Sequence, residues 1–96
     1  MIMNIMNSNA FQNKAKRLVV DHFNQNYDKD NPTIIDMDDV YVVWFCKTLQ
    51  NWKALLSTTV PDGKYYEVTY NGDKREAYLD VYVKHHNARI PDPDVL

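Results

Sequence analysis

Residues 38–60 are Asp-Asp-Val-Tyr-Val-Val-Trp-Phe-Cys-Lys-Thr-Leu-Gln-Asn-Trp-Lys-Ala-Leu-Leu-Ser-Thr-Thr-Val, the longest apolar, β-branched and aromatic stretch of the chain. Its first half alternates with a period of two, which is typical of a strand. We predict a β-hairpin in which Gln50-Asn51 forms the turn and Leu49 lies opposite Trp52. The alternative is a helical turn over residues 49–56, and the run Ser57-Thr58-Thr59-Val60 argues against it.

This register divides the hairpin side chains between two faces, because successive residues of a strand point to opposite sides of a sheet. One face, face A, receives Tyr41, Val43, Phe45, Leu49, Trp52, Ala54, Leu56 and Val60. The other face, face B, receives Val42, Trp44, Cys46 and Leu55. A slip of one residue would exchange the two sets.

An amphipathic helix is predicted before the hairpin, from the N-cap Ser8 to about Tyr27. Its apolar stripe consists of Phe11, Ala15, Leu18, Val19, His22 and Phe23. Pro32 keeps the following segment from continuing the helix. We therefore expect an acidic loop over residues 28–39, which contain five Asp and one Lys.

Two further strands are predicted over residues 65–70 and 74–84, after the turn signals Pro61-Asp62-Gly63-Lys64 and Asn71-Gly72. If the loops have even lengths, face B gains Tyr66, Val68, Tyr70, Ala77, Leu79, Val81 and Val83. Face A then gains Tyr65, Glu67, Thr69, Glu76, Tyr78, Asp80 and Tyr82. The predicted fold is α+β, an N-terminal helix packed on face B of a four-stranded antiparallel β-meander. We expect a single domain over residues 1–96, with an ordered core at about 8–90 and flexible tails.

The composition bounds the class of protein. A net charge of −2 gives no bias toward nucleic acid or membrane. A single cysteine excludes an internal disulfide and suits a reducing cytoplasm. No secretion signal and no apolar run of roughly 18 residues is visible, and Met6 is an alternative start to Met1. We expect a cytoplasmic protein that does not enter the membrane.

Face A is the predicted interaction surface, because one helix covers only one side of the sheet. We expect a protein partner or a second copy of the chain to bind there. The predicted partner-binding residues are Phe45, Leu49, Trp52, Leu56, Tyr65, Tyr78 and Tyr82, with the acidic Asp36, Asp38 and Asp39 beside them. The alternative is that the tails or the 28–39 loop fold back over this face.

Nucleic-acid binding is the less favoured reading of the tyrosines, because Glu67, Glu76 and Asp80 beside them would repel phosphates. An accessory protein that binds nucleic acid through Lys14, Lys16 and Arg17 stays open as the alternative function.

Metal and catalytic sites find little support in the pattern. The zinc candidates are Cys46, His22, His85 and His86, and their spacing is not that of a structural zinc site, so no cofactor is expected. A mixed site of Cys46 and His22 remains geometrically possible. The calcium-like start Asp28-Lys29-Asp30-Asn31 lacks the required Gly and Glu. Ser57 and Cys46 have no fixed histidine partner, so an enzyme is not expected.

A resemblance to a known family rests on three segments: Trp44-Phe45-Cys46-Lys47-Thr48-Leu49-Gln50-Asn51-Trp52-Lys53-Ala54, Tyr65-Tyr66-Glu67-Val68-Thr69-Tyr70-Asn71-Gly72 and Tyr78-Leu79-Asp80-Val81-Tyr82. Over about residues 8–92 the chain resembles small proteins with a domain of unknown function that phages and prophages of Gram-positive bacteria encode. The family has no catalytic motif to carry over. By analogy, the resemblance implies a protein that binds and inhibits or redirects a host protein, such as an anti-CRISPR inhibitor of the type II effector nuclease.

Overall fold

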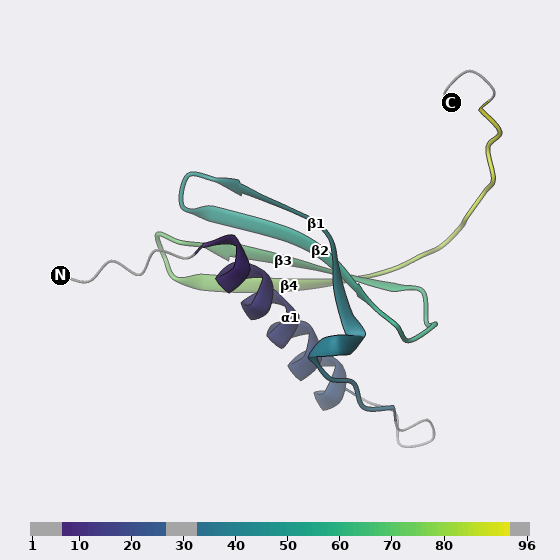
Figure 1. Ribbon diagram of the computed structural model, residues 1–96, viewed down its shortest axis with the longest axis horizontal. Helices are drawn as coiled ribbons and strands as arrows, with labels where there is room; N and C mark the ends of the chain where they lie inside the picture. Colours follow the sequence, from purple (N-terminus) through teal and green to yellow (C-terminus); the bar gives the residue numbers. More distant parts are fainter. Residues whose placement is uncertain (1–6, 27–32, 93–96) are drawn as a thin grey trace.

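Helix α1 (Ser8–Gln25) lies across one face of a four-stranded antiparallel sheet, as the computed structural model shows (Figure 1). The structure describes residues 7–26 and 33–92. The strands are β1 (Val40–Thr48), β2 (Asn51–Thr58), β3 (Lys64–Asn71) and β4 (Glu76–Val83), preceded by the short 3-10 helix η1 (Met37–Asp39). Their order in the sheet is β1-β2-β3-β4, which confirms the predicted α+β fold and its meander.

The helix begins one residue earlier than predicted, at the N-cap Asn7, whose Oδ1 accepts a hydrogen bond of 2.8 Å from the Ala10 N–H. It ends at Asn26, whose backbone and side-chain N–H groups both donate to the His22 carbonyl. The predicted end at Tyr27 and the calcium-like segment 28–31 lie outside the described residues.

The core lies between α1 and the central strands. Phe11 stacks on Trp52 with 5.0 Å between the ring centroids, and His22 meets the Tyr66 ring edge-on at 6.3 Å. The buried apolar side chains are Phe11, Ala15, Val19, Val20, Ile35, Val40, Trp52, Ala54, Leu56, Tyr66 and Val68. Burial of these side chains is the main stabilising contribution to the fold.

The expected placement of Trp52, Ala54 and Leu56 on the uncovered face is wrong, because all three are buried under the helix. The cause is the β2–β3 turn, whose five residues, 59–63, make an odd-length loop. Leu56 therefore pairs with Tyr66, and Ala54 with Val68. Within this turn the Lys64 N–H donates to Asp62 Oδ1, and Gly63 adopts a φ of +71°.

The β1–β2 hairpin also turns one residue earlier than predicted, at Leu49-Gln50. Phe45 therefore pairs with Ala54 rather than Leu56, a shift of two residues that leaves each side chain on the same side of the hairpin. A bulge between Val42 and Trp44 then exchanges the faces of β1. Consequently Val42 is half-buried on the helix side, while Trp44 and Cys46, which were predicted in the core, are exposed on the other face.

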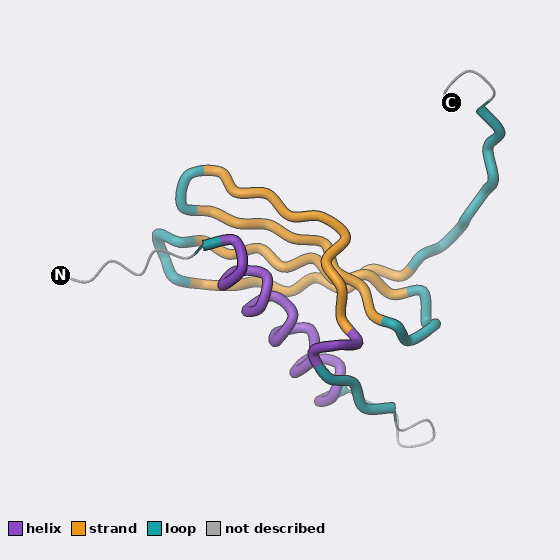
Figure 2. The backbone as a smooth tube through the Cα atoms, viewed as in Figure 1, coloured by secondary structure: helices purple, strands orange, loops and turns teal. Residues whose placement is uncertain are grey.

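The two hairpin turns meet at one end of the sheet (Figure 2). The Gly72 N–H donates to the Gln50 carbonyl over 3.0 Å, and a Cβ at Gly72 would lie 2.2 Å from that oxygen. The β3–β4 turn has four residues, 72–75, instead of the predicted two, but its even length keeps the predicted faces of β3 and β4. Glycine is therefore required at position 72 by the approach of the neighbouring turn.

Gly72→Ala is expected to lower the free energy of unfolding by about 1–3 kcal/mol, because the two turns must separate to admit the methyl group. Urea unfolding monitored by circular dichroism measures the change. Asp73→Ala in the same turn is the control and should change stability by less than about 0.5 kcal/mol. Equal effects of the two substitutions would contradict the steric explanation.

Asp39 joins η1 to the β2–β3 turn. Its Oδ2 accepts from the Asp36 N–H at 3.0 Å, its Oδ1 accepts from the Thr59 hydroxyl at 3.1 Å, and its carbonyl accepts from the Thr59 N–H at 2.9 Å. The Asp36 N–H, followed by the Thr59 hydroxyl, lowers the pKa of the Asp39 carboxyl. Part of the predicted acidic loop is thus ordered, and its hydrogen bonds fix the start of β1 to the β2–β3 turn.

Asp39→Asn is expected to destabilise the fold at neutral pH, and the difference from the wild type should shrink in acid. A carboxylate whose pKa is lowered by folding stabilises above its unfolded pKa, and this contribution is lost as the pH falls through the folded pKa. Urea midpoints at neutral and acidic pH measure both effects. Asp38→Asn removes the same charge one residue away and serves as the control; a pH-independent deficit of Asp39→Asn would contradict the assignment.

Candidate functional site

The side of the sheet turned away from α1 is the candidate site, and we call it the open face. Its side chains include Tyr41, Trp44, Cys46, Lys53, Leu55, Tyr65, Glu67, Thr69, Glu76, Tyr78, Asp80 and Tyr82. Among the described residues no element packs over it: α1 lies on the opposite side, and residues 84–92 run away from the sheet (Figure 1). The large aromatic side chains of both edge strands are accordingly exposed.

The open face has an apolar half and an acidic half. On β1 and β2 it presents Tyr41, Trp44 and Leu55, while β3 and β4 contribute Glu67 and Asp80, directly paired across the strands. The Lys53 Nζ lies 3.5 Å from a Glu67 carboxylate oxygen and links the two halves. A surface of this kind can bury rings and still form charge-assisted hydrogen bonds.

The tyrosines of the acidic half are bound to neighbouring carboxylates. The Tyr78 hydroxyl donates to the Glu76 carboxylate, and this hydrogen bond raises the pKa of Tyr78. The charge of Glu67 raises the pKa of Tyr82, whose hydroxyl lies 3.5 Å from it. Both phenols therefore stay protonated at neutral pH. The acidic half presents aromatic rings and carboxylates together. This combination suits the guanidinium and ammonium groups of a protein better than the phosphates of a nucleic acid.

The structure separates the residues that were predicted to form one site. Tyr65, Tyr78 and Tyr82 lie on the open face as expected. Phe45, Trp52 and Leu56 lie on the helix side, and Leu49 is exposed at the β1–β2 turn. Phe45 stacks on Trp52 at 6.3 Å near the sheet edge.

Sequence reasoning missed Trp44 and Leu55 as members of the open face. These two residues pair directly across β1 and β2. The predicted register correctly placed them on the side of the hairpin opposite Trp52 and Leu56. Which of these two sides the helix covers depends on the length of the β2–β3 loop, and this was predicted wrongly. The sequence signal for this turn was the Asp62-Gly63 pair. Gly63 supplies the positive φ that the chain needs just before β3 begins at Lys64.

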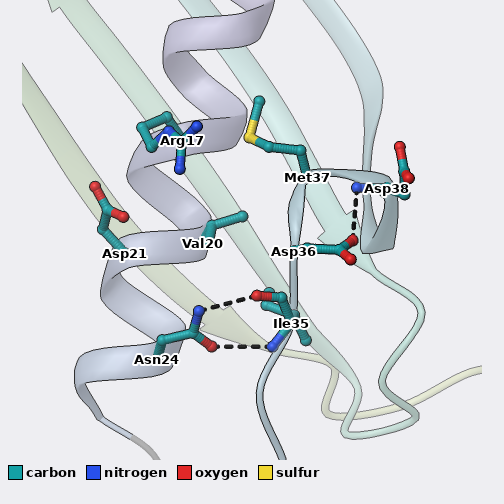
Figure 3. A pocket seen from close by; sticks show the side chains of 8 residues that line it. All are labelled: Arg17, Val20, Asp21, Asn24, Ile35, Asp36, Met37 and Asp38. Carbon is teal, nitrogen blue, oxygen red and sulfur yellow. Dashed lines mark hydrogen bonds between the residues drawn. The ribbon is translucent and has the colours of Figure 1, made fainter.

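The predicted acidic residues lie elsewhere, on the helix side, where Asp36 and Asp38 line a groove of about 510 Å³ (Figure 3). Its other lining residues are Arg17, Val20, Asp21, Asn24, Ile35 and Met37. The Asn24 amide donates to the Ile35 carbonyl at 2.9 Å and accepts from the Ile35 N–H at 3.0 Å, which fixes the segment to α1. Asp36 caps η1 through the Asp38 N–H. Asn24 and Asp36 therefore use their side chains for structural hydrogen bonds within the fold.

The zinc candidates are not brought together. Cys46 lies on the open face and His22 on α1 at the opposite side of the sheet, so the mixed site considered from the sequence is wrong. His85 and His86 belong to the exposed stretch after β4. Within residues 7–26 and 33–92, no three His, Cys, Asp or Glu side chains are grouped closely enough to hold a metal ion.

No helix in the described part of the chain has the length and apolar character needed to cross a membrane.

The two tryptophans test the assignment of the faces. Trp52→Ala is expected to lower the free energy of unfolding by about 3–5 kcal/mol, because Trp52 is only 7% exposed and packs on Phe11. Trp44→Ala, at 43% exposure, should cost about 1 kcal/mol or less. Acrylamide quenching of the single-tryptophan variants Trp44→Phe and Trp52→Phe provides an independent measurement. Stronger quenching of Trp52 than of Trp44 would show that the faces are reversed.

The comparisons with known proteins give a family but no precedent for the site. No curated protein and no solved structure matches the chain. A family model, described as a family of unknown function (DUF6275), matches residues 12–92, which is most of the chain and includes the whole sheet. The chain belongs to the DUF6275 family.

Proposed function

We propose that the protein is a binding module that docks a partner protein on its open face and acts without chemistry of its own. The observation that carries this proposal is the exposure of Trp44, Tyr78 and Tyr82 together on one uncovered sheet surface. Exposed apolar patches of this kind are typical of interaction sites, and Trp and Tyr are the residues that most often dominate binding energy.

The chemistry of the open face supports a protein partner over a nucleic acid. Its cation Lys53 is paired with Glu67, and Lys84 sits 5.7 Å from the Tyr65 ring centroid. Nucleic-acid affinity depends on cations that neutralise phosphates. Of the helix cations, Lys14 lies over the Tyr70 ring, and Arg17 lines the groove that also contains Asp21, Asp36 and Asp38.

The partner class follows from the resemblance to phage-encoded proteins. We propose a host protein as the target, and the type II CRISPR effector nuclease as the first one to assay. The carboxylates Glu67, Glu76 and Asp80 support a target with exposed Arg or Lys side chains, because such groups form charge-assisted pairs with carboxylates. The protein would then act by occupying a basic surface of that target.

Trp44→Ala and Phe45→Ala form a matched pair that tests the proposal. The two residues are neighbours with 43% and 40% exposure, but they point to opposite faces of β1. The effector nuclease is titrated with each variant, and both target cleavage and the affinity by calorimetry are measured. Trp44→Ala should weaken binding at least about tenfold, whereas Phe45→Ala should change it by less than about threefold.

Three results would overturn parts of the proposal. Absence of binding and inhibition rejects this nuclease as the target. Loss of binding with Phe45→Ala but not with Trp44→Ala moves the interface off the open face. Salt-dependent binding of duplex or single-stranded DNA that is lost when Lys14, Lys16 and Arg17 are replaced by Ala would favour the nucleic-acid accessory instead.

A further inference from the structure

Strand β4 is an edge of the sheet that is exposed on both sides. Its open-face side chains are Tyr78, Asp80 and Tyr82. On its helix side it presents only apolar residues, Ala77, Leu79, Val81 and Val83, and Val81 and Val83 are 40% and 65% exposed. Helix α1 packs against β1, β2 and β3, so it does not bury this row as it buries the central strands. Such a strand is an available template for another strand.

The outer edge of β4 has backbone groups ready to pair. The Lys84 N–H donates to the Gly63 carbonyl at 2.7 Å, so the residue that follows β4 still points its backbone toward the β3 side. Hydrogen bonding alternates along an antiparallel pair, which turns the N–H and C=O groups of Leu79 and Val81 outward. β4 has no bulge or proline, whereas the other edge strand, β1, is interrupted by a bulge that protects it.

The residues of β4 and Lys84 are self-complementary about Asp80. If an antiparallel copy is placed so that Asp80 faces Asp80, Leu79 faces Val81 and Ala77 faces Val83. On the open-face side Tyr78 faces Tyr82, and Glu76 faces Lys84. Each of these four pairs occurs twice because of the two-fold symmetry. Aromatic, apolar and opposite-charge pairs across antiparallel strands are all favourable.

We propose that the protein forms a homodimer through antiparallel β4–β4 pairing, which makes one continuous eight-stranded sheet. The two-fold axis stands perpendicular to the sheet at Asp80, so both helices lie on one side and both open faces on the other. The second copy is the fitting occupant because the pattern of charges, Glu76 at one end and Lys84 at the other, complements itself. This interface is the outer edge of β4; it shares Tyr78 and Tyr82 with the rim of the open face but does not depend on the proposed function.

Charge exchange between the two ends tests the register. Glu76→Lys or Lys84→Glu alone places two like-charged pairs in the interface and should raise the dimer dissociation constant about tenfold. The double variant Glu76→Lys/Lys84→Glu restores the pairs and should return the constant to within about threefold of the wild type. Asp80→Asn removes the central repulsion and should tighten the dimer. Sedimentation equilibrium of the full chain over micromolar to submillimolar concentrations measures the dissociation constants of the wild type and of the four variants.

Hydrogen exchange of the wild type is a second readout that does not depend on any variant. The amides of Leu79 and Val81 should exchange more slowly as the protein concentration rises, because pairing protects them. The amides of Tyr78 and Asp80 already bond to β3, so their exchange rates should not depend on protein concentration. Uniform protection along β4 would indicate a different contact.

A matched pair of valines locates the interface. Val81→Lys on β4 and Val43→Lys on β1 introduce the same charge at residues with 40% and 46% exposure on opposite edges. Val81→Lys should abolish the dimer, and Val43→Lys should leave it intact. A wild-type monomer at submillimolar concentration, a dimer lost only with Val43→Lys or Trp44→Ala, or a double charge variant as weak as the single ones would each overturn the proposal.

Discussion

A single helix cannot cover a four-stranded sheet, and this limit of size shapes the surface of the protein. An α-helix with its side chains is about 10–12 Å wide, whereas the axes of the outer strands in a four-stranded sheet lie about 14–15 Å apart. Helix α1 packs against β1, β2 and β3, with Phe11 on Trp52 and His22 against Tyr66. On the helix side of β4, Leu79 still packs against the core while Val81 and Val83 are exposed, and the open face has no described helix to cover it.

The elements of this fold could be predicted because their signals are local. Period-two alternation marked β1, β3 and β4, the hairpin turn and the run over residues 57–60 marked β2, and the stripe from Phe11 to Val19 marked the buried side of the helix. The choice between faces is not local, because it depends on whether each connection contains an odd or an even number of residues. The four-residue turn after Asn71 preserved the predicted faces of β4, and the five-residue turn before Lys64 reversed those of β2.

The β1 bulge illustrates the same difficulty within one strand. Val42 and Val43 are equally suited to a strand and give no sign that the register changes between Val42 and Trp44. The bulge lets Val40 and Val42 turn toward the helix although Trp44 turns away. The residues predicted for the uncovered face therefore included the tyrosines that lie there, but they included Trp52 instead of Trp44.

The acidic residues form two groups, one that makes hydrogen bonds within the fold and one that lies on the open face. The amino-acid composition does not distinguish them. Asp36 and Asp39 use their carboxylates to cap η1 and to hold the β2–β3 turn, so a dense acidic stretch has a structural use. Glu67, Glu76 and Asp80 are spread along β3 and β4, yet the pairing of these strands gathers them beside Tyr78 and Tyr82. Spacing in the sheet, rather than spacing in the sequence, creates the charged surface.

The alternation of β4 allows the two proposed interfaces to coexist. Its odd-numbered residues, Leu79 and Val81 among them, direct their backbone groups outward and their side chains to the helix side. Its even-numbered residues, such as Tyr78 and Tyr82, bond to β3 through the backbone and keep their rings on the open face. The backbone hydrogen bonds of a β4–β4 pair would therefore come from residues whose side chains lie on the helix side, and the pairing would place two copies of the open face side by side on one surface.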